Sequence, residues 1–516
     1  MQSVSSDWVE NQEQNFVSES YAEISMKVAD PEASEDAVPT DNGDVYFSDT
    51  ENVVKDAVKS AKKLATLEMN IWSLDGNCNL LNASSPYGQN GYVGDGVGDD
   101  DGYYATAPTL TITFPSLVAS AIPGITIVWG ENYDEYADSF TITIKNGDTV
   151  VLTKTVTGNT DVRTEITDEV SNYNSIVIEV TRWCLPNRRA RIKEVTIGIY
   201  KVFEKTDIMS IENSFIADPL SASLPMSEIK FVLKNLNGEY NSENPSGVAK
   251  YIMERQRVMV RYGYMINGLK EWINGGLYYL AEWDMPQNGI TATFTARDAL
   301  EYMQDIYTGV LGGKTLYEIA VDAFTQAGMP TLEIGVDRWV IDNSLQSITA
   351  PNGAYAENAS IATILQYVAN AGCCVFYQDR DGVLHIEPLD DTPTDYIINE
   401  FVSYENASTQ FLKQIKGVTI SNGDNDYTYT YATVGDIQQV QNPLISQSRA
   451  PTVAAWVYNN LVNRKIMSGS FRADPRLDAL DVVEVETPYT NNDCVITEIT
   501  YSFNGAFHGS YSGRCV

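Results

Sequence analysis

The sequence predicts a mainly β protein: an N-terminal jelly-roll β-sandwich, then two small antiparallel β-barrels separated by a compact α+β domain. Apolar residues alternate with threonines through Ile290–Ala296, which is the pattern of a half-buried antiparallel strand. Short runs of this kind recur along the chain and are joined by glycine, asparagine and proline turns. Between 301 and about 392 the apolar spacing becomes helical instead.

The length of 516 residues is enough for three or four domains, and the hydrophobic content of 43% is enough to bury sizeable cores. Changes in apolar period and in turn content set the expected boundaries. We expect an N-terminal acidic segment at 1–65, the jelly roll at 66–203, the first barrel at 204–300, the α+β domain at 301–392 and the second barrel at 393–516.

The net charge of −35 disfavours binding to nucleic acid or anionic membranes, because a field of that sign repels phosphate groups. Two interpretations remain. The charge keeps the protein soluble within an assembly, or it lines a channel that DNA passes without adhering. No apolar run approaches the roughly 18–20 residues of a membrane-spanning helix. The first residues lack the basic and apolar stretches of a signal peptide, so we expect a soluble protein made in a cytoplasm.

The six cysteines and two histidines argue against an enzyme. None of the cysteines forms a CxxC pair, so buried reduced thiols are expected. Two histidines exclude most zinc enzymes and leave little room for a Ser-His-Asp site. His385 falls on a predicted strand, where we interpret it as a packed or surface residue. No catalytic residue and no required cofactor is predicted.

Seven short strands predict the jelly roll, and a helix over 51–64 precedes them. The strands are separated by turns at the spacing that is usual in sandwiches. They are expected at 67–72, Thr109–Phe114, Ile125–Trp129, Ser139–Ile144, Val150–Val156, Ile176–Thr181 and Ala190–Tyr200.

A long loop rich in glycine and aspartate separates the first two of these strands, from about 87 to 104. Its carboxylates could supply oxygen ligands to calcium, although their spacing matches no EF-hand. A solvated loop with no metal is the alternative interpretation. The candidate ligands are Asp95, Asp99, Asp100 and Asp101.

Aromatic and arginine residues gather at strand ends and loops of the same domain. Aromatic faces stack on sugar rings, and arginines hydrogen-bond hydroxyls or carboxylates. The same residue types also anchor protein interfaces and pack in cores. A saccharide site, a protein interface and a structural role therefore all stay open for Trp129, Tyr133, Tyr136, Arg182, Trp183, Arg188 and Arg189.

The α+β domain is predicted from helix start and stop signals. Thr315 and Glu318 form a capping box, and the helix that follows is expected to end at Gly328. A second helix is expected from Ser360 to a stop at Gly372, followed by a hairpin over 374–378 and 383–387.

The last segment returns to strands and contains one amphipathic helix from about Thr452 to Met467. Strands are expected at Phe411–Ile420, Tyr427–Val434, Asp481–Glu486, Cys494–Phe503 and Ala506–Arg514. The closing strands follow the same order as those of 256–300, beginning with a V-x-V strand in each case. This similarity predicts that one strand set is duplicated within the chain.

Residues 204–516 resemble the hub, or tail-associated, proteins of long-tailed phages and prophages. The resemblance is carried by an ordered set of stretches rather than by one motif, and 66–203 is similar to the galactose-binding-like jelly rolls inserted in such proteins. The stretches are Val258–Gly263, Trp272–Trp283, Thr293–Asp298, Gln378–Ile386, Phe471–Leu477 and Asp481–Val485.

The resemblance implies a homotrimer in which two related barrels per chain give six around the axis, so that a three-fold hub mates with a six-fold tail tube. It implies a structural role at a virion tail tip or baseplate. The expected partners are the tail tube or distal tail protein and the tail fibres, spikes or receptor-binding proteins, while DNA is passing cargo. Candidate subunit anchors, equally plausible as core residues, are Trp272, Tyr278, Trp283 and Trp456.

A carbohydrate-binding virion or surface protein is the alternative function. In it the jelly roll would recognise a host cell-wall saccharide, and the rest of the chain would act as a scaffold.

Overall fold

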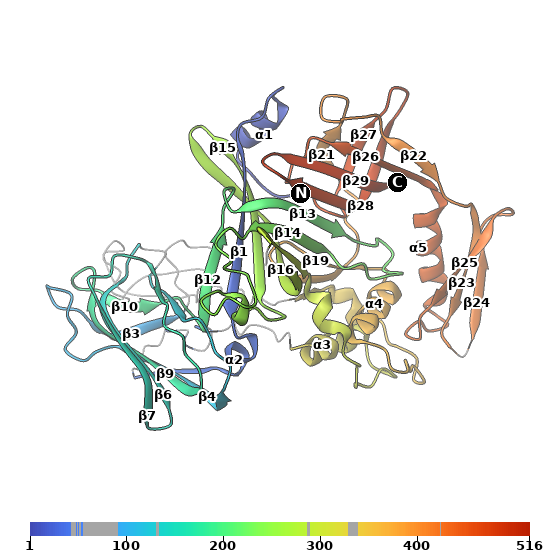
Figure 1. Cartoon of the computed structure of the whole chain (residues 1–516). Helices are drawn as coiled ribbons and strands as arrows, with labels where there is room; N and C mark the ends of the chain where they lie inside the picture. The colour runs from blue at the N-terminus through green and yellow to red at the C-terminus, as the bar shows by residue number, and fades with distance from the viewer. Residues whose placement is uncertain are drawn as a thin grey trace.

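The computed structural model describes residues 1–42, 48, 50, 53–54, 91–130, 134–285, 289–328, 339–423 and 425–516. The chain is mainly β, as predicted, and its helices are few and short. Figure 1 shows a β-rich lobe at the lower left, a central curved sheet, and helices gathered below and beside that sheet. The helix predicted over 51–64 and the strand predicted over 67–72 lie outside the described residues, apart from Val53 and Val54.

The lobe formed by residues 91–197, together with 38–42, is a sandwich of facing sheets. Its five-stranded sheet has the order β2 (Val38–Asp41), β4 (Thr109–Val118), β9 (Tyr173–Trp183), β6 (Ala137–Asn146) and β7 (Thr149–Thr157). A second sheet has the order β11 (Glu194–Thr196), β5 (Ile125–Val128) and β8 (Arg163–Ile166), and β10 (Arg189–Ile192) pairs with β3 (Tyr92–Val97). Alternate residues of these sheets, including Ile127, Ile142 and Ile178, meet in one core.

The central sheet joins strands from nearly the whole length of the chain. Its path is β12 (Gly198–Phe203), β1 (Ser20–Ala29), β15 (Arg257–Ile266), β16 (Leu269–Asp284), β17 (Thr291–Arg297), β14 (Glu228–Lys234), β13 (Ile208–Ile216), β28 (Asn491–Phe503), β29 (Phe507–Cys515), β26 (Lys465–Phe471) and β22 (Ser408–Phe411). β27 (Val482–Glu486) branches from β28 and pairs with β21 (Pro393–Ile398).

The N-terminal segment contributes β1 to this sheet. Ile24 lies opposite Phe203 on one side and Val260 on the other, so β1 fills the space between β12 and β15. Its buried residues alternate with half-buried ones along the first part of the strand, as is usual for a strand inside a sheet. Two short helices flank it, α1 (Ser6–Glu13) and α2 (Pro31–Asp36).

The prediction of two separate closed barrels is wrong in its closure, because the described strands form one open sheet instead. The physical reason is the dual pairing of β13. One edge of β13 bonds to β14 of its own strand set, and the other edge bonds to β28 of the second set. An edge that would have closed the first barrel is thus used to attach the second strand set.

The predicted duplication is confirmed by strand order. The order β15-β16-β17-β14-β13, which we name the first repeat, recurs as β27-β28-β29-β26-β22, the second repeat. In each repeat, three consecutive strands form a meander, and the strand that precedes the meander in the chain pairs antiparallel with its last strand. Both meanders carry a bulge at the same place, after Leu280 in β16 and after Ile496 in β28.

The bulges align the two repeats residue by residue. Tyr278 lies two positions before Leu280, and Cys494 lies two positions before Ile496, so Tyr278 and Cys494 occupy equivalent positions. Tyr278 pairs with Val258, and Cys494 pairs with Val483. The V-x-V strands that suggested duplication in the sequence are therefore structurally equivalent.

The α+β domain lies between the repeats in sequence and packs below the central sheet (Figure 1). It contains η5 (Ala299–Gln304), α3 (Leu316–Gln326), β18 (Trp339–Ile341), η6 (Asn343–Ser347), α4 (Ile361–Gly372), β19 (Val375–Gln378) and β20 (Leu384–Glu387). The capping box is present: the Thr315 hydroxyl accepts from the Glu318 N–H at 3.2 Å, and the Glu318 carboxylate accepts from the Thr315 N–H at 2.8 Å. Ser360 caps α4, and Cys373 ends it in the left-handed region.

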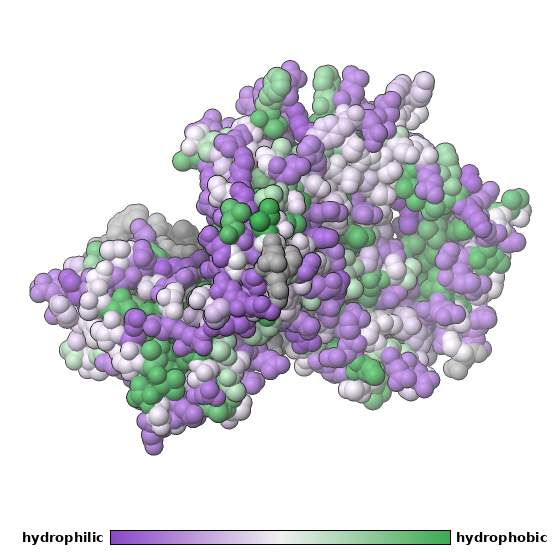
Figure 2. Space-filling view, in the orientation of Figure 1, coloured by the Kyte–Doolittle hydropathy of each residue, from purple (hydrophilic) through white to green (hydrophobic). Residues whose placement is uncertain are grey.

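A small unit is inserted between β22 and β26. It comprises β23 (Ile415–Ser421), β24 (Asp426–Thr430), β25 (Asp436–Gln441) and α5 (Ala450–Val462), and it shares a core with α3 and α4. A further 3-10 turn, η4, spans Ala249–Tyr251. Figure 2 shows apolar surface over the α5 side of this unit. The prediction that α5 runs to Met467 is wrong, because Lys465–Phe471 forms β26 and bonds to β29.

The five described cysteines are free, and Cys374, Cys494 and Cys515 are buried, whereas Cys184 and Cys373 are half-buried. Within the described ranges, none of the helices has the length and apolar character needed to span a bilayer.

Candidate functional site

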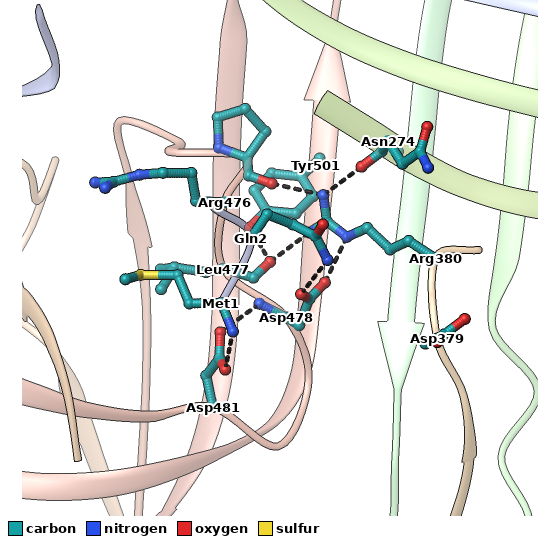
Figure 3. Close-up of polar contacts among 12 residues, drawn as sticks. Met1, Gln2, Asn274, Asp379, Arg380, Arg476, Leu477, Asp478, Asp481 and Tyr501 are labelled. Atoms are coloured by element: carbon teal, nitrogen blue, oxygen red, sulfur yellow. Dashed lines mark hydrogen bonds and ion pairs between the residues drawn. The ribbon is translucent and has the colours of Figure 1, made fainter. Parts of the chain in front are cut away.

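One arginine ties the α+β domain to both repeats. Arg380 lies in the turn between β19 and β20, and only 4% of its surface is exposed. Its guanidinium donates to the carbonyl oxygen of Asn274 at 2.8 Å in the first repeat. It also donates at 2.6 Å to the carbonyl oxygens of Pro475 and Leu477, in the loop before β27. Its Nε donates to the Asp478 carboxylate, and Figure 3 shows these contacts converging on one group.

Aromatic rings surround the buried guanidinium. The Cζ atom of Arg380 lies 4.8 Å from the ring centroid of Phe215 and 5.8 Å from that of Tyr501. The Tyr501 hydroxyl donates to the Leu477 carbonyl oxygen at 2.6 Å. Burial lowers the pKa of Arg380, but the Asp478 carboxylate together with Tyr501 and Tyr262 more than offsets this, so the pKa is raised overall. A planar group with several fixed donors is suited to holding three chain segments in one geometry.

A cleft of about 560 Å³ lies beside this junction, between β13, the β19–β20 hairpin and the loop after Asp478. The Met1 amine lies 2.6 Å from an Asp481 oxygen, and the Gln2 side chain donates to Asp478 at 3.0 Å (Figure 3). The cleft is strongly acidic. Its carboxyl groups belong to Asp298, Asp379, Glu387, Asp390, Asp395, Asp478 and Asp481.

Several groups in or beside the cleft have shifted pKa values, among them Asp298, Asp481 and His385. Burial raises the pKa of Asp298 to about 7, although two backbone N–H groups donate to its carboxylate. Burial also raises the pKa of Asp481, against the opposing effect of the Met1 amine. Burial lowers the pKa of His385, but hydrogen bonds to Asp379 and Glu387 more than offset this and raise it.

His385 is a packed strand residue, as predicted. Its ring stacks on Tyr377 at 4.9 Å, and its Nε2 lies 3.0 Å from the Asp379 carboxylate. In the part of the chain that the structure describes, no three or more His, Cys, Asp or Glu side chains are arranged to hold a metal ion. The contacts of Arg380 hold the β19–β20 hairpin of the α+β domain against both repeats.

The two tryptophans of the predicted sandwich cluster are core residues. Trp129 is fully buried and Trp183 is 1% exposed, so neither indole face is open to a sugar ring. The Trp129 Nε1 donates to Thr164 at 2.8 Å, and the Trp183 Nε1 donates to Glu135 at 2.8 Å. Both indoles lie in the hydrophobic core of the sandwich.

The arginines of the cluster bind the aspartate-rich loop. Arg182 donates to the Asp101 carbonyl oxygen at 3.1 Å and forms an ion pair with Asp138 at 3.3 Å. Arg189 donates to the carbonyl oxygens of Gly94 and Asp95. The two groups of residues that we predicted as separate sites thus meet at one edge of the sandwich.

The remaining members lie nearby. Arg188 donates to the second oxygen of Glu135 at 3.1 Å, and Tyr136 is half-buried against the core. Tyr133 lies outside the described residues.

The aspartates themselves form a turn. The Asp99 carboxylate accepts from the N–H groups of Asp101 and Tyr103, both at 2.9 Å. Asp100 accepts from the Asn187 amide at 3.3 Å. These four described carboxylates do not gather into a group of three that could ligate calcium.

The four predicted subunit anchors have different environments. Tyr278 is buried, and its hydroxyl donates to Asn213 at 2.6 Å, which makes it a core residue. Trp456 packs against the helical core, and Trp272 is half-buried beneath Arg261, whose Cζ lies 4.5 Å from its ring. Trp283 is the most open of the four, with 37% of its surface exposed.

Sequence reasoning missed two residues. Arg380 was interpreted only as part of a turn, and no local signal marks its burial. Phe411 on the edge strand β22 is 65% exposed. The signal that could have found Phe411 is the alignment of the two repeats, which starts from the V-x-V strands and makes Phe411 the equivalent of the buried Phe215.

No family model and no curated protein matches the chain. Among solved structures, it is similar to the 43 kDa tail protein of prophage MuSo2 from Shewanella oneidensis, with 13% identity, a TM-score of 0.42, and coverage of 61% of this chain and 95% of that one. A tail protein from Neisseria meningitidis MC58 gives 11% identity, a TM-score of 0.43 and coverage of 61% and 93%. The prophage tail protein gp18 from Listeria monocytogenes EGD-e gives 15%, 0.38, 61% and 91%. At these values the likeness is remote and concerns the fold alone.

Proposed function

We propose that this chain is a structural component of a phage tail tip or baseplate, a hub whose copies surround the tail axis. The observation that carries the proposal is the duplicated strand order of the central sheet. A chain that contains the same unit twice presents two equivalent surfaces. Three chains then present six, which is the number needed for a three-fold hub to meet a six-fold tube.

The sequence resemblance of 204–516 to tail hubs supports the same function. The resembling stretches contribute β15, β16, β17, β20 and β27, together with the loop before β27 whose carbonyl oxygens accept hydrogen bonds from Arg380. The parts of the chain that resemble a hub are thus the parts that build the repeats and fix them to the α+β domain. A rigid junction suits a component that transmits load rather than one that turns over a substrate.

The net charge supports a passage for DNA. A chain with a charge of −35 repels phosphate, so a ring lined by its carboxylates would let DNA pass without binding it. In this proposal the tail tube or distal tail protein lies on one side of the ring, and fibres, spikes or receptor-binding proteins lie on the other.

Saccharide binding by the sandwich is not favoured by the geometry of its predicted cluster. The aromatic faces that would stack on a sugar are buried at Trp129 and Trp183, and the arginines are engaged with the aspartate-rich loop. The structural role at the tail is therefore the function that the arrangement supports best.

Deletion of the gene from its phage tests the proposal. We expect particles whose tails lack a closed tip and do not infect, with recovery when the wild-type chain is supplied in trans. Antibodies raised against the chain should label the tail end in electron micrographs of wild-type virions. Normal, infectious tails without the chain would contradict the proposal.

A further inference from the structure

We propose that β22 of one chain pairs, edge to edge, with the free edge of β16 in a second copy of this chain, so that Phe411 lies opposite the partner's Trp283. The pairing would repeat between chains the junction that β13 and β28 already form within the chain. The inference deepens the self-association in the proposed function and rests on it.

Within the chain, β28 of the second repeat pairs with an edge strand of the first repeat, and this junction is the pattern for the proposed contact between chains. β28 shares one edge between two partners: β27 pairs with residues 491–495, and β13 pairs with residues 498–503. Near the start of the second stretch, Phe215 of β13 lies opposite Ile499. Phe215 is 8% exposed and Ile499 is fully buried.

The corresponding stretch of β16 is open. β15 pairs with β16 only up to Tyr279, and Leu280 exchanges backbone hydrogen bonds with Arg255 and Gln256. Among the described strands, none pairs with the same edge over residues 281–284. Ile499 lies three positions after Ile496, the last residue before the β28 bulge, and Trp283 lies three positions after Leu280, its counterpart in β16.

The corresponding edge strand of the second repeat is open as well. β22 holds the place beside β26 that β13 holds beside β14, and among the described strands β26 is its only partner. When the strand pairs are followed outward from the two bulges, Asn213 and Thr409 occupy equivalent positions. Phe215 and Phe411, each two residues further along, are therefore equivalent as well. The pairs that carry this register are Leu280–Ala296, Ile229–Ala296 and Asn213–Ile229 in the first repeat, and Ile496–Gly513, Met467–Gly513 and Thr409–Met467 in the second.

The two open edges therefore carry large apolar side chains at matching positions. Phe411 is 65% exposed and Trp283 is 37% exposed, whereas their equivalents within the chain are buried against each other. Exposed apolar residues on unpaired edges are a liability that folded proteins usually cover. A second copy of this chain is the partner whose register matches both edges.

The charges are compatible with this pairing. Ser408–Phe411 carries no charged residue, so Glu282 and Asp284 of β16 meet no like charge on the facing strand. The contact is heterologous, because two different edges meet. Contacts of that kind close into a ring when the rotation between copies is suitable.

Disulfide trapping tests the pairing. Chains with Phe411→Cys and chains with Trp283→Cys are mixed and oxidised mildly, and dimers are measured on a non-reducing gel. The matched control mixes Phe411→Cys with Glu282→Cys, which shifts the register by one residue and turns the side chains to opposite faces. We expect about tenfold more dimer from the first mixture than from the control. Wild-type chain oxidised in the same way reports any background from the native cysteines.

The variant positions are exposed, so far-ultraviolet circular dichroism and thermal melting should be unchanged and should exclude misfolding as a cause. A cross-link specific to the first mixture supports the pairing. Equal cross-linking in both mixtures, or none in either, overturns it. If light scattering shows assembled chains that lack this cross-link, the edge pairing fails while the proposed hub stands.

Discussion

Phe215 on β13 lies directly opposite Ile499 on β28, and this cross-strand pair is where the first repeat of the chain joins the second. The Phe215 ring contacts Tyr501 edge-on, with 6.2 Å between centroids, and Tyr278 in a tilted arrangement at 6.4 Å. Arg380 covers the same ring from the α+β domain. Three parts of the molecule therefore share one packing point.

Loss of the Phe215 ring should weaken the whole central sheet. We expect Phe215→Ala to lower the free energy of unfolding by about 3–5 kcal/mol, because a buried aromatic side chain leaves a cavity. Its equivalent on the open edge is the matched control. Phe411→Ala, measured on dilute single chains, should change stability by less than about 0.5 kcal/mol. Equal losses in urea denaturation of the two variants would contradict the assigned roles.

Arg380→Leu should separate the α+β domain from the repeats. The substitution removes the guanidinium donors to Asp478 and to three carbonyl oxygens, although Asp478 keeps the Gln2 amide and the Leu477 carbonyl keeps the Tyr501 hydroxyl. Loss of a buried charged partner costs about 3–5 kcal/mol. Arg261→Leu removes an ion pair with Glu23 whose arginine is 46% exposed, and should cost less than about 1 kcal/mol. Limited proteolysis and calorimetry would reveal the expected early release of the domain. Unaltered melting of Arg380→Leu would show that the contacts are dispensable.

Asp298 should make stability fall as pH rises. Its folded-state pKa of about 7 exceeds the value of about 4 for an unfolded carboxyl group. The folded protein therefore binds the extra proton between these two values. The associated stability is complete below about pH 4 and is lost as pH rises to about 7, at roughly 1.4 kcal/mol for each pH unit.

Asp298→Asn tests this directly, because the amide carries no charge at any of these pH values. The difference in unfolding free energy between wild type and variant should change through the window from about pH 4 to 7 and level off above it. Parallel pH profiles for the two proteins would rule out Asp298 as the titrating group.

Cys494 and Cys515 should form a disulfide under mild oxidation. They are direct cross-strand neighbours on β28 and β29, and their Sγ atoms lie 3.0 Å apart. A disulfide oxidant such as oxidised glutathione would take two hydrogens from the thiols and be reduced itself. Closing a loop of this size should stabilise the protein by roughly 3 kcal/mol. Peptide mapping should find the linked pair, and Cys494→Ser should abolish both the link and the stabilisation.

Local structure was predictable where the signal was local. The capping box at Thr315 and the helix start at Ser360 depend on a few neighbouring residues, and both are present. Each V-x-V strand is also a local pattern, and its occurrence in both halves indicated the duplication. The extension of the last helix to Met467 failed because apolar spacing cannot report that Lys465–Phe471 has a strand partner in β29.

Features that depend on distant partners were not predictable. The place of β1 between β12 and β15 is set by strands 169 or more residues away. A charged residue in a turn, such as Arg380, is usually solvated, and only the assembled junction shows why it is buried. Trp183 could be assigned to a surface or a core from its neighbours, and its contact with Glu135 decides for the core.

The most direct test of the account is the absolute mass of the purified chain by light scattering, with electron micrographs of the same peak. We predict a species of three times the 57.1 kDa chain mass, seen as a ring with six similar lobes around its centre. Single chains at every concentration, with no ring in the images, would contradict the central claim that the duplicated sheet builds a hub.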